Sequence, residues 1–170
     1  MVSAGGGNAA FEVSMLPEDY KRLSPEVIAK IKPLTDDPET TDTGQLAARR
    51  YLADMGISLK TAIDARIGCL VHRCFGGKDS KDGKDKKNAA GMMYQCIAYV
   101  NYINGQPVNV KYRSCDATAS GYTKCWSQDS PTTPCPPYNI DCINPLLIAE
   151  ENIPRLIVTE GERDVLTLRE

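Results

Sequence analysis

The sequence predicts an α+β fold with short N-terminal helices, a small antiparallel sheet built on a β-hairpin at about 93–126, and a C-terminal strand–turn–helix unit. Three observations predict it. Ser24-Pro25 has the form of a helix start, two β-rich runs flank Asn104-Gly105, and an apolar run at 156–158 leads into a turn and a helix start. At 170 residues, the chain is long enough for one domain of ordinary size.

The N-terminal region is expected to contain three short helices after a flexible start. Residues 1–16 are rich in Gly and should be disordered. Ser24 caps a first helix that Pro33 stops. Two further helices are each expected between a capping residue and a terminating glycine: 44–55, capped at or near Thr43 and ended by Gly56, and 59–67, capped by Ser58 and closed by Gly68.

The hairpin is the clearest signal in the chain. Asn-Gly favours a two-residue type I′ turn, which pairs Ile103 with Gln106 and continues as 101–108, 99–110 and 97–112. Because side chains alternate with a period of two, one face becomes the expected core: Ile97, Tyr99, Ile103, Val108, Val110 and Tyr112. The other face carries Cys96, Ala98, Val100 and Tyr102, which lie opposite Arg113, Lys111, Asn109 and Pro107, in that order.

The placement of Lys111 and Arg113 has two interpretations. Like charges side by side on a strand are unfavourable unless an anion lies over them, which indicates a phosphate-binding face. Alternatively, both are solvated cations on an exposed strand. Lys124 and Trp126 follow a turn and are expected to return as a third strand beside the same surface. Before the hairpin, residues 76–91 mix Lys with Asp and are expected to form a solvated loop.

The C-terminal unit places three carboxylates at one turn. The apolar run 156–158 is typical of a strand buried on both faces, and a helix is expected from about Asp164. Glu160, Glu162 and Asp164 lie within five residues, an arrangement that favours a metal ion or a cationic partner. The alternative is an ordinary strand–turn–helix with a solvated acidic turn.

Composition narrows the class of protein. Residues 60–125 hold eleven Lys and Arg against five Asp and Glu, whereas residues 126–170 hold three against eight. A basic middle beside an acidic end suits a polyanion-binding surface next to a metal site. Seven Cys without any C-x-x-C pair, and a single His72, argue against a zinc site. Without a signal-peptide pattern or a membrane-length apolar run, a cytoplasmic protein away from membranes is expected.

Several stretches together resemble a known family. Leu156-Ile-Val-Thr-Glu160-Gly-Glu162-Arg-Asp164-Val-Leu resembles the first motif of the TOPRIM fold, in the version of phage primase-helicases and Twinkle-like primases. Residues 51–61 resemble the helical leader of that family, and residues 93–126 resemble its polymerase domain in order and spacing. The resemblance covers about 45–170. It implies a flexible segment with a short helix (1–40), an N-terminal primase subdomain (41–152) and an incomplete TOPRIM start (153–170).

The resemblance implies RNA primer synthesis on single-stranded DNA during replication. Glu160 matches the catalytic or metal-site carboxylate, and Glu162 and Asp164 match the flanking acidic positions around Mg²⁺ or Mn²⁺. The expected partners are single-stranded DNA and ribonucleoside triphosphates, with a helicase module or a separate C-terminal half. The basic residues are expected to contact the incoming nucleotide or primer beside Trp126 and to face Glu160 across a groove: Lys111, Arg113 and Lys124.

Parts of the family pattern do not occur in this sequence. There is no later Asp-x-Asp motif, no Gly-Lys-Ser/Thr phosphate loop and no preceding zinc module. The chain is therefore expected to be truncated within the first TOPRIM motif and inactive as a primase alone. The alternative is a non-catalytic nucleic-acid-binding or regulatory module of a phage or mobile element that keeps only the basic sheet.

Overall fold

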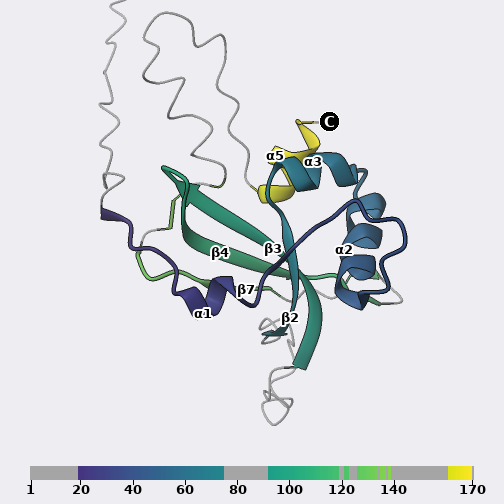
Figure 1. Cartoon of the computed structure of the whole chain (residues 1–170), viewed down its shortest axis with the longest axis horizontal. Helices are drawn as coiled ribbons and strands as arrows, with labels where there is room; N and C mark the ends of the chain where they lie inside the picture. Colours follow the sequence, from purple (N-terminus) through teal and green to yellow (C-terminus); the bar gives the residue numbers. More distant parts are fainter. Residues whose placement is uncertain are drawn as a thin grey trace, which may run out of the picture.

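The computed structural model describes residues 19–74, 92–118, 121–122, 126–133, 135–136, 138 and 161–169 (Figure 1). Some predictions fall outside these residues and stay predictions. They are the flexible start at 1–16, the loop at 76–91, the strand at 156–158, Lys124, Glu160 and the side chain of Trp126.

The described chain is a mixed α+β structure around one antiparallel sheet. The five strands have the order β1-β2-β3-β4-β7 and are Lys32–Pro33, Gly68–Cys74, Met92–Ile103, Gln106–Ser114 and Trp126–Asp129. A separate two-stranded pair joins β5 (Ala117–Thr118) to β6 (Gly121–Tyr122). The helices are α1 (Pro25–Ile28), α2 (Thr43–Asp54), α3 (Leu59–Asp64) and α5 (Glu162–Thr167). In this part of the chain, no helix is long and apolar enough to cross a membrane.

Capping side chains fix the helix starts. Ser24 accepts a hydrogen bond from the Val27 amide, as predicted for α1. The cap of α2 is Asp42, one residue before the expected Thr43, and its carboxylate accepts from the amides of Gly44 and Gln45. A carboxylate accepts two amide donors better than a hydroxyl does, which explains the one-residue difference.

The helix ends differ more from expectation. Gly56 ends α2 with a positive φ of 70°, as predicted. The prediction that α3 runs to 67 is wrong, because the helix stops at Asp64 and Arg66 adopts a φ of 56°. The Ile67 amide bonds back to the Ala62 carbonyl at 2.9 Å, closing a Schellman-type end with Arg66 in place of glycine. This reversal turns Ile67, 1% exposed, into the core.

The β3–β4 turn forms as predicted, but the pairing changes two residues later. Asn104 and Gly105 have φ values of 51° and 73°, as a type I′ turn requires. Ile103 pairs with Gln106 and Tyr102 with Pro107, whereas Asn101 then pairs with Asn109 and leaves Val108 as an extra residue. A β-bulge of this kind shifts every later pair by one position.

The bulge overturns the predicted core face. Lys111 lies opposite Tyr99 and Arg113 opposite Ile97, so the cations share the face that carries these two side chains. Val110 and Tyr112, expected on the face of Ile97 and Tyr99, instead pack on the other face with Ala98 and Val100. A one-residue shift exchanges the two faces because side chains alternate along a strand.

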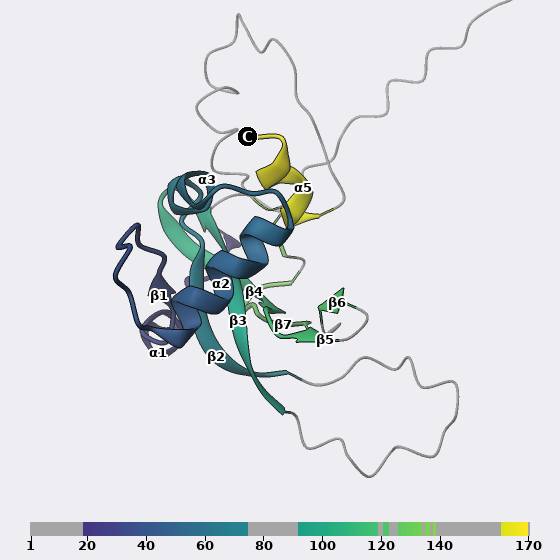
Figure 2. The same ribbon diagram turned by 90° about the vertical axis from the view of Figure 1, so that its right-hand side faces the viewer.

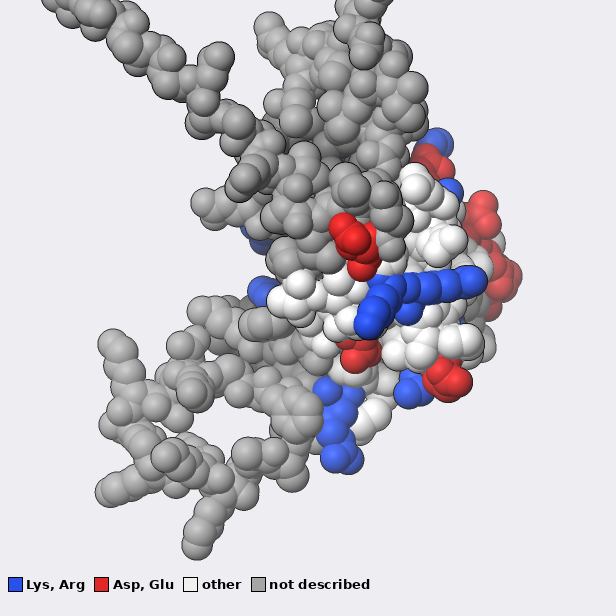
Figure 3. All heavy atoms as spheres, turned by 90° about the vertical axis from the view of Figure 1, so that its left-hand side faces the viewer, with Lys and Arg blue, Asp and Glu red and all other residues white. Residues whose placement is uncertain are grey.

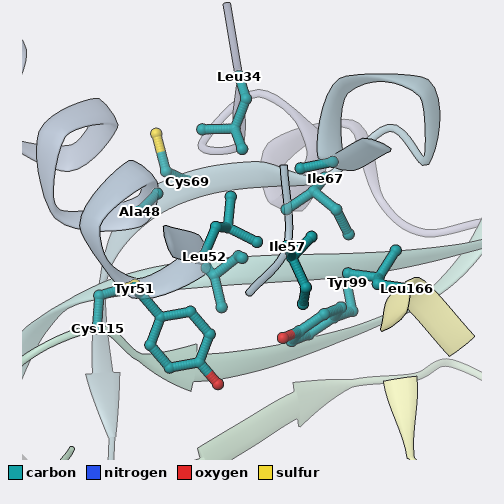
Figure 4. Close-up of a cluster of buried hydrophobic side chains, with 12 residues drawn as sticks. Leu34, Ala48, Tyr51, Leu52, Ile57, Ile67, Cys69, Tyr99, Cys115 and Leu166 are labelled. Carbon is teal, nitrogen blue, oxygen red and sulfur yellow. The ribbon is translucent and has the colours of Figure 1, made fainter. Parts of the chain in front are cut away.

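Both faces of the sheet are covered by apolar side chains. On one face, α2, α3 and α5 pack over β2 and β3, with fully buried side chains that include Leu52, Ile97 and Leu166 (Figures 2 and 4). On the other, Leu23 and α1 cover Leu70 and Ala98. Burial of each large apolar side chain stabilises the fold by about 1.5–3 kcal/mol. The expectation of a single core face is therefore wrong.

Candidate functional site

Two adjoining recesses lie where α5 meets the face of β3 and β4. One, of about 280 Å³, is lined by Tyr99, Lys111, Tyr112, Arg113 and Glu162. The other, of about 250 Å³, is lined by Tyr51, Tyr99, Arg113, Gly161, Glu162, Arg163 and Asp164. Three residues belong to both recesses and therefore stand at the boundary between them: Tyr99, Arg113 and Glu162.

The cations of the site come from β4. Lys111 and Arg113 are two residues apart on one strand and therefore point to the same side. Lys111 keeps 40% of its side chain exposed, and Arg113 is exposed. In register, β7 places Gln128 beside Lys111 and the backbone of Trp126 beside Arg113. No carboxylate of the described residues pairs with Arg113.

The carboxylates of the site come from the first turn of α5. Lys111 Nζ donates a hydrogen bond to Glu162 Oε1, across 51 residues of sequence. The Glu162 side chain is 19% exposed, so this ion pair is partly shielded from water. Asp164 lies 3.8 Å from Arg163 Nε. Leu166, with no exposed surface, anchors α5 in the core cluster (Figure 4).

Two tyrosines form a polar part of the recess floor. Tyr51 from α2 and Tyr99 from β3 are 5% exposed, and both are labelled in Figure 4. Burial raises the pKa of Tyr99 far above its usual range, and the neighbouring Tyr51, Tyr138 and Glu162 add to the effect. One of these effects is a hydrogen bond between the side chains of Tyr99 and Tyr51, so the Tyr99 hydroxyl already has a partner in the recess floor.

A buried asparagine pair lies next to this floor. Asn101 Nδ2 donates to Asn109 Oδ1 at 3.0 Å and to the Pro136 carbonyl at 3.2 Å. These bonds hold the segment after β7 against the sheet. The ring of Tyr138 in this segment meets Tyr99 edge-on, with 5.8 Å between centroids. The pair thus positions the segment whose Tyr138 ring packs against Tyr99, a residue of both recesses.

The structure brings four of the predicted site residues together: Lys111, Arg113, Glu162 and Asp164. Glu160 and Lys124 lie outside the described residues, as does the side chain of Trp126. The predicted metal role of Glu160, Glu162 and Asp164 stays a prediction. Among the described residues, no three His, Cys, Asp or Glu side chains are grouped so that they could hold a metal ion.

Sequence reasoning missed Tyr51 and Arg163, and it treated Tyr99 only as a core residue. The available signal was the amphipathic character of tyrosine, whose ring packs in a core while its hydroxyl reaches a polar boundary.

Other surfaces are less distinctive. On the face shown in Figure 3, basic and acidic side chains of the described residues are interspersed with uncharged ones.

Comparisons with known proteins do not assign a function to the chain, so a proposal depends on the residues of the site. No family model matches the chain, and neither the curated proteins nor the solved structures include a match to it.

Proposed function

We propose that the chain binds ribonucleoside triphosphates and single-stranded DNA in the recesses beside α5, as the nucleotide- and template-binding part of a TOPRIM-type DNA primase. One observation carries the proposal. Lys111 and Arg113 stand side by side on one face, and a carboxylate from a distant segment, Glu162, pairs with Lys111. Two adjacent cations, one of which already binds a carboxylate, are suited to phosphate groups. The planar guanidinium of Arg113 is suited to bidentate contact.

The resemblance adds a divalent metal to this arrangement. Carboxylate oxygens are the ligands that Mg²⁺ and Mn²⁺ prefer, and Glu162 and Asp164 line the second recess. Together with Glu160, they would hold the ion. When bound, the metal would shield phosphate charge and favour attack by a hydroxyl group. Lys111 and Arg113 would orient the phosphates.

Binding can be measured with a fluorescently labelled single-stranded oligonucleotide and, by calorimetry, with ATP and magnesium. The double variant Lys111→Ala/Arg113→Ala should weaken both affinities at least tenfold. It should also reduce the salt slope of DNA binding by about 1.4, because two phosphate contacts are lost. The control is Lys30→Ala/Arg22→Ala, which removes the same charge from exposed residues elsewhere. Equal weakening by both double variants would contradict the proposal.

Catalysis is tested separately. With a single-stranded template, ribonucleotides and magnesium, the chain alone should yield no short RNA, because its sequence holds no second acidic motif of the Asp-x-Asp type. Robust primer synthesis by the isolated chain would show that the site needs no such motif. It would refute the expectation that the chain is inactive as a primase alone.

A non-catalytic nucleic-acid-binding module is the second candidate. It is favoured by the ion pairs of the two carboxylates. Glu162 contacts Lys111 and Asp164 lies near Arg163, so each already has a cationic side chain beside it in place of a metal ion. Glu160→Ala separates the two candidates. This candidate holds if that variant keeps metal and nucleotide binding while Lys111→Ala/Arg113→Ala abolishes DNA binding. Loss of Mn²⁺ affinity in Glu160→Ala supports the primase-type site instead.

A further inference from the structure

The anion position over Lys111 is already occupied by the protein itself. Lys111 Nζ contacts the Glu162 carboxylate, with 40% and 19% of the respective side chains exposed. A phosphate that reaches Lys111 therefore comes close to the Glu162 carboxylate, and the repulsion between the two anions favours displacement of the carboxylate. Arg113 differs, because no carboxylate in the described part of the chain pairs with it. Among the described residues, the two cations are thus unequal, because Lys111 has a carboxylate partner and Arg113 has none.

The spacing of the cations restricts the ligand. The Cα atoms of residues two apart on a strand are separated by roughly 7 Å. A single phosphate can bind the exposed Arg113 and leave the ion pair between Lys111 and Glu162 in place. A chain of linked phosphates spans the distance and gains both contacts. Its second contact, at Lys111, offsets the loss of the internal ion pair.

Glu162 also has space to move. It lines both recesses, and the second has a volume of about 250 Å³. A change of side-chain rotamer within α5 would carry the carboxylate from one recess to the other. The anchor of the helix, Leu166, lies one turn further on and would stay in the core.

We infer that the site takes a chain of linked phosphates that bridges Arg113 and Lys111 and displaces the carboxylate of Glu162 from Lys111. The inference rests on the proposed phosphate-binding function. It adds that Glu162 is an internal competitor for the ligand, and that the competition affects linked phosphates much more than a single phosphate.

The test is calorimetric titration with inorganic tripolyphosphate and with orthophosphate, in the presence of EDTA. Glu162→Gln keeps the shape of the side chain and removes its charge, so tripolyphosphate should bind roughly tenfold more tightly. Orthophosphate should gain about twofold at most, because it can bind Arg113 without displacing Glu162 from Lys111. The control is Asp64→Asn, which removes the charge of another lysine–carboxylate pair, Lys60–Asp64, and should change neither affinity.

A double variant distinguishes displacement from a general field effect. In a Lys111→Met background, Glu162→Gln should no longer tighten tripolyphosphate binding, because the contested cation is absent. An equal gain in that background, or an equal gain for both ligands, would overturn the inference. If Lys111→Met weakens binding but Glu162→Gln has no effect, only the inference fails. If neither Lys111→Met nor Arg113→Ala alters tripolyphosphate binding, the proposed function fails with it.

Discussion

Substitution of Leu166 by alanine should detach α5 from the sheet without unfolding the rest of the chain. Leu166 is the one residue of α5 that is buried, with no exposed surface. Helix α5 has six residues, far fewer than an isolated helix needs to be stable in water. Its position therefore depends on the packing of this side chain, on the ion pair between Lys111 and Glu162, and on the 3.5 Å hydrogen bond that Arg163 Nη1 donates to Met55 Sδ.

The magnitude follows from the burial. Replacing a fully buried leucine by alanine costs about 2–5 kcal/mol. Detachment of α5 limits this cost, because the free energy of unfolding cannot fall by more than the docking of the helix contributes. A loss of about 2 kcal/mol, at the lower end of the range, is therefore expected. By the same relation, opening of α5 should become about 30-fold more frequent.

Hydrogen exchange followed by mass spectrometry measures both effects. Amides in 161–169 should lose protection, while those of β3 and β4 should change only with global stability, which urea unfolding measures separately. The matched control is Leu168→Ala, because Leu168 is 57% exposed and its loss should cost less than about 0.5 kcal/mol. The reasoning is refuted if protection of 161–169 survives in Leu166→Ala, or if both variants behave alike.

Three further predictions concern the sheet. Tyr112→Phe removes the 2.7 Å bond from its hydroxyl to Asp129 and should lower the free energy of unfolding by about 1–2 kcal/mol in urea; an unchanged midpoint would contradict this. Burial lowers the pKa of His72 from 6.5, with Asp129 opposing and Lys30 assisting the shift. The unfolded chain thus binds the proton more readily, and stability should fall as the pH drops below about 6.5; an NMR midpoint above 6.5 for this imidazole would refute the sign. Burial raises the pKa of Cys115 to about 12, so at pH 8 a disulfide reagent should modify it more slowly than the half-buried Cys135, and equal rates by mass spectrometry would count against it.

The local features of the fold are predictable because single residues encode them. Asn104-Gly105 accepts two positive φ values at little cost, so the type I′ turn follows from two letters of sequence. Ser24 and Ser58 cap helices for an equally local reason. The end of α3 is not encoded in this way. Arginine is an uncommon residue in the left-handed region, and the burial of Ile67 imposes the stop at Arg66.

The register of the hairpin was not predictable from its alternating pattern. Both faces of β3 are apolar, with Ile97 and Tyr99 on one and Ala98 and Val100 on the other. Either register of β4 therefore satisfies its apolar positions, and the pattern alone cannot choose between them. The contact of Lys111 with Glu162 is harder still to predict, because it joins residues 51 positions apart. No local signal specifies such a distance.

The bulge at Val108 makes the length of β4 a functional variable. A deletion or insertion of one residue between the turn and Lys111 would send both cations to the face covered by α1, away from α5. A change of two residues would preserve their side while moving them along the strand. In a relative or an engineered variant, the parity of this short segment, more than the identity of its residues, would therefore tell whether the basic pair still meets the acidic helix.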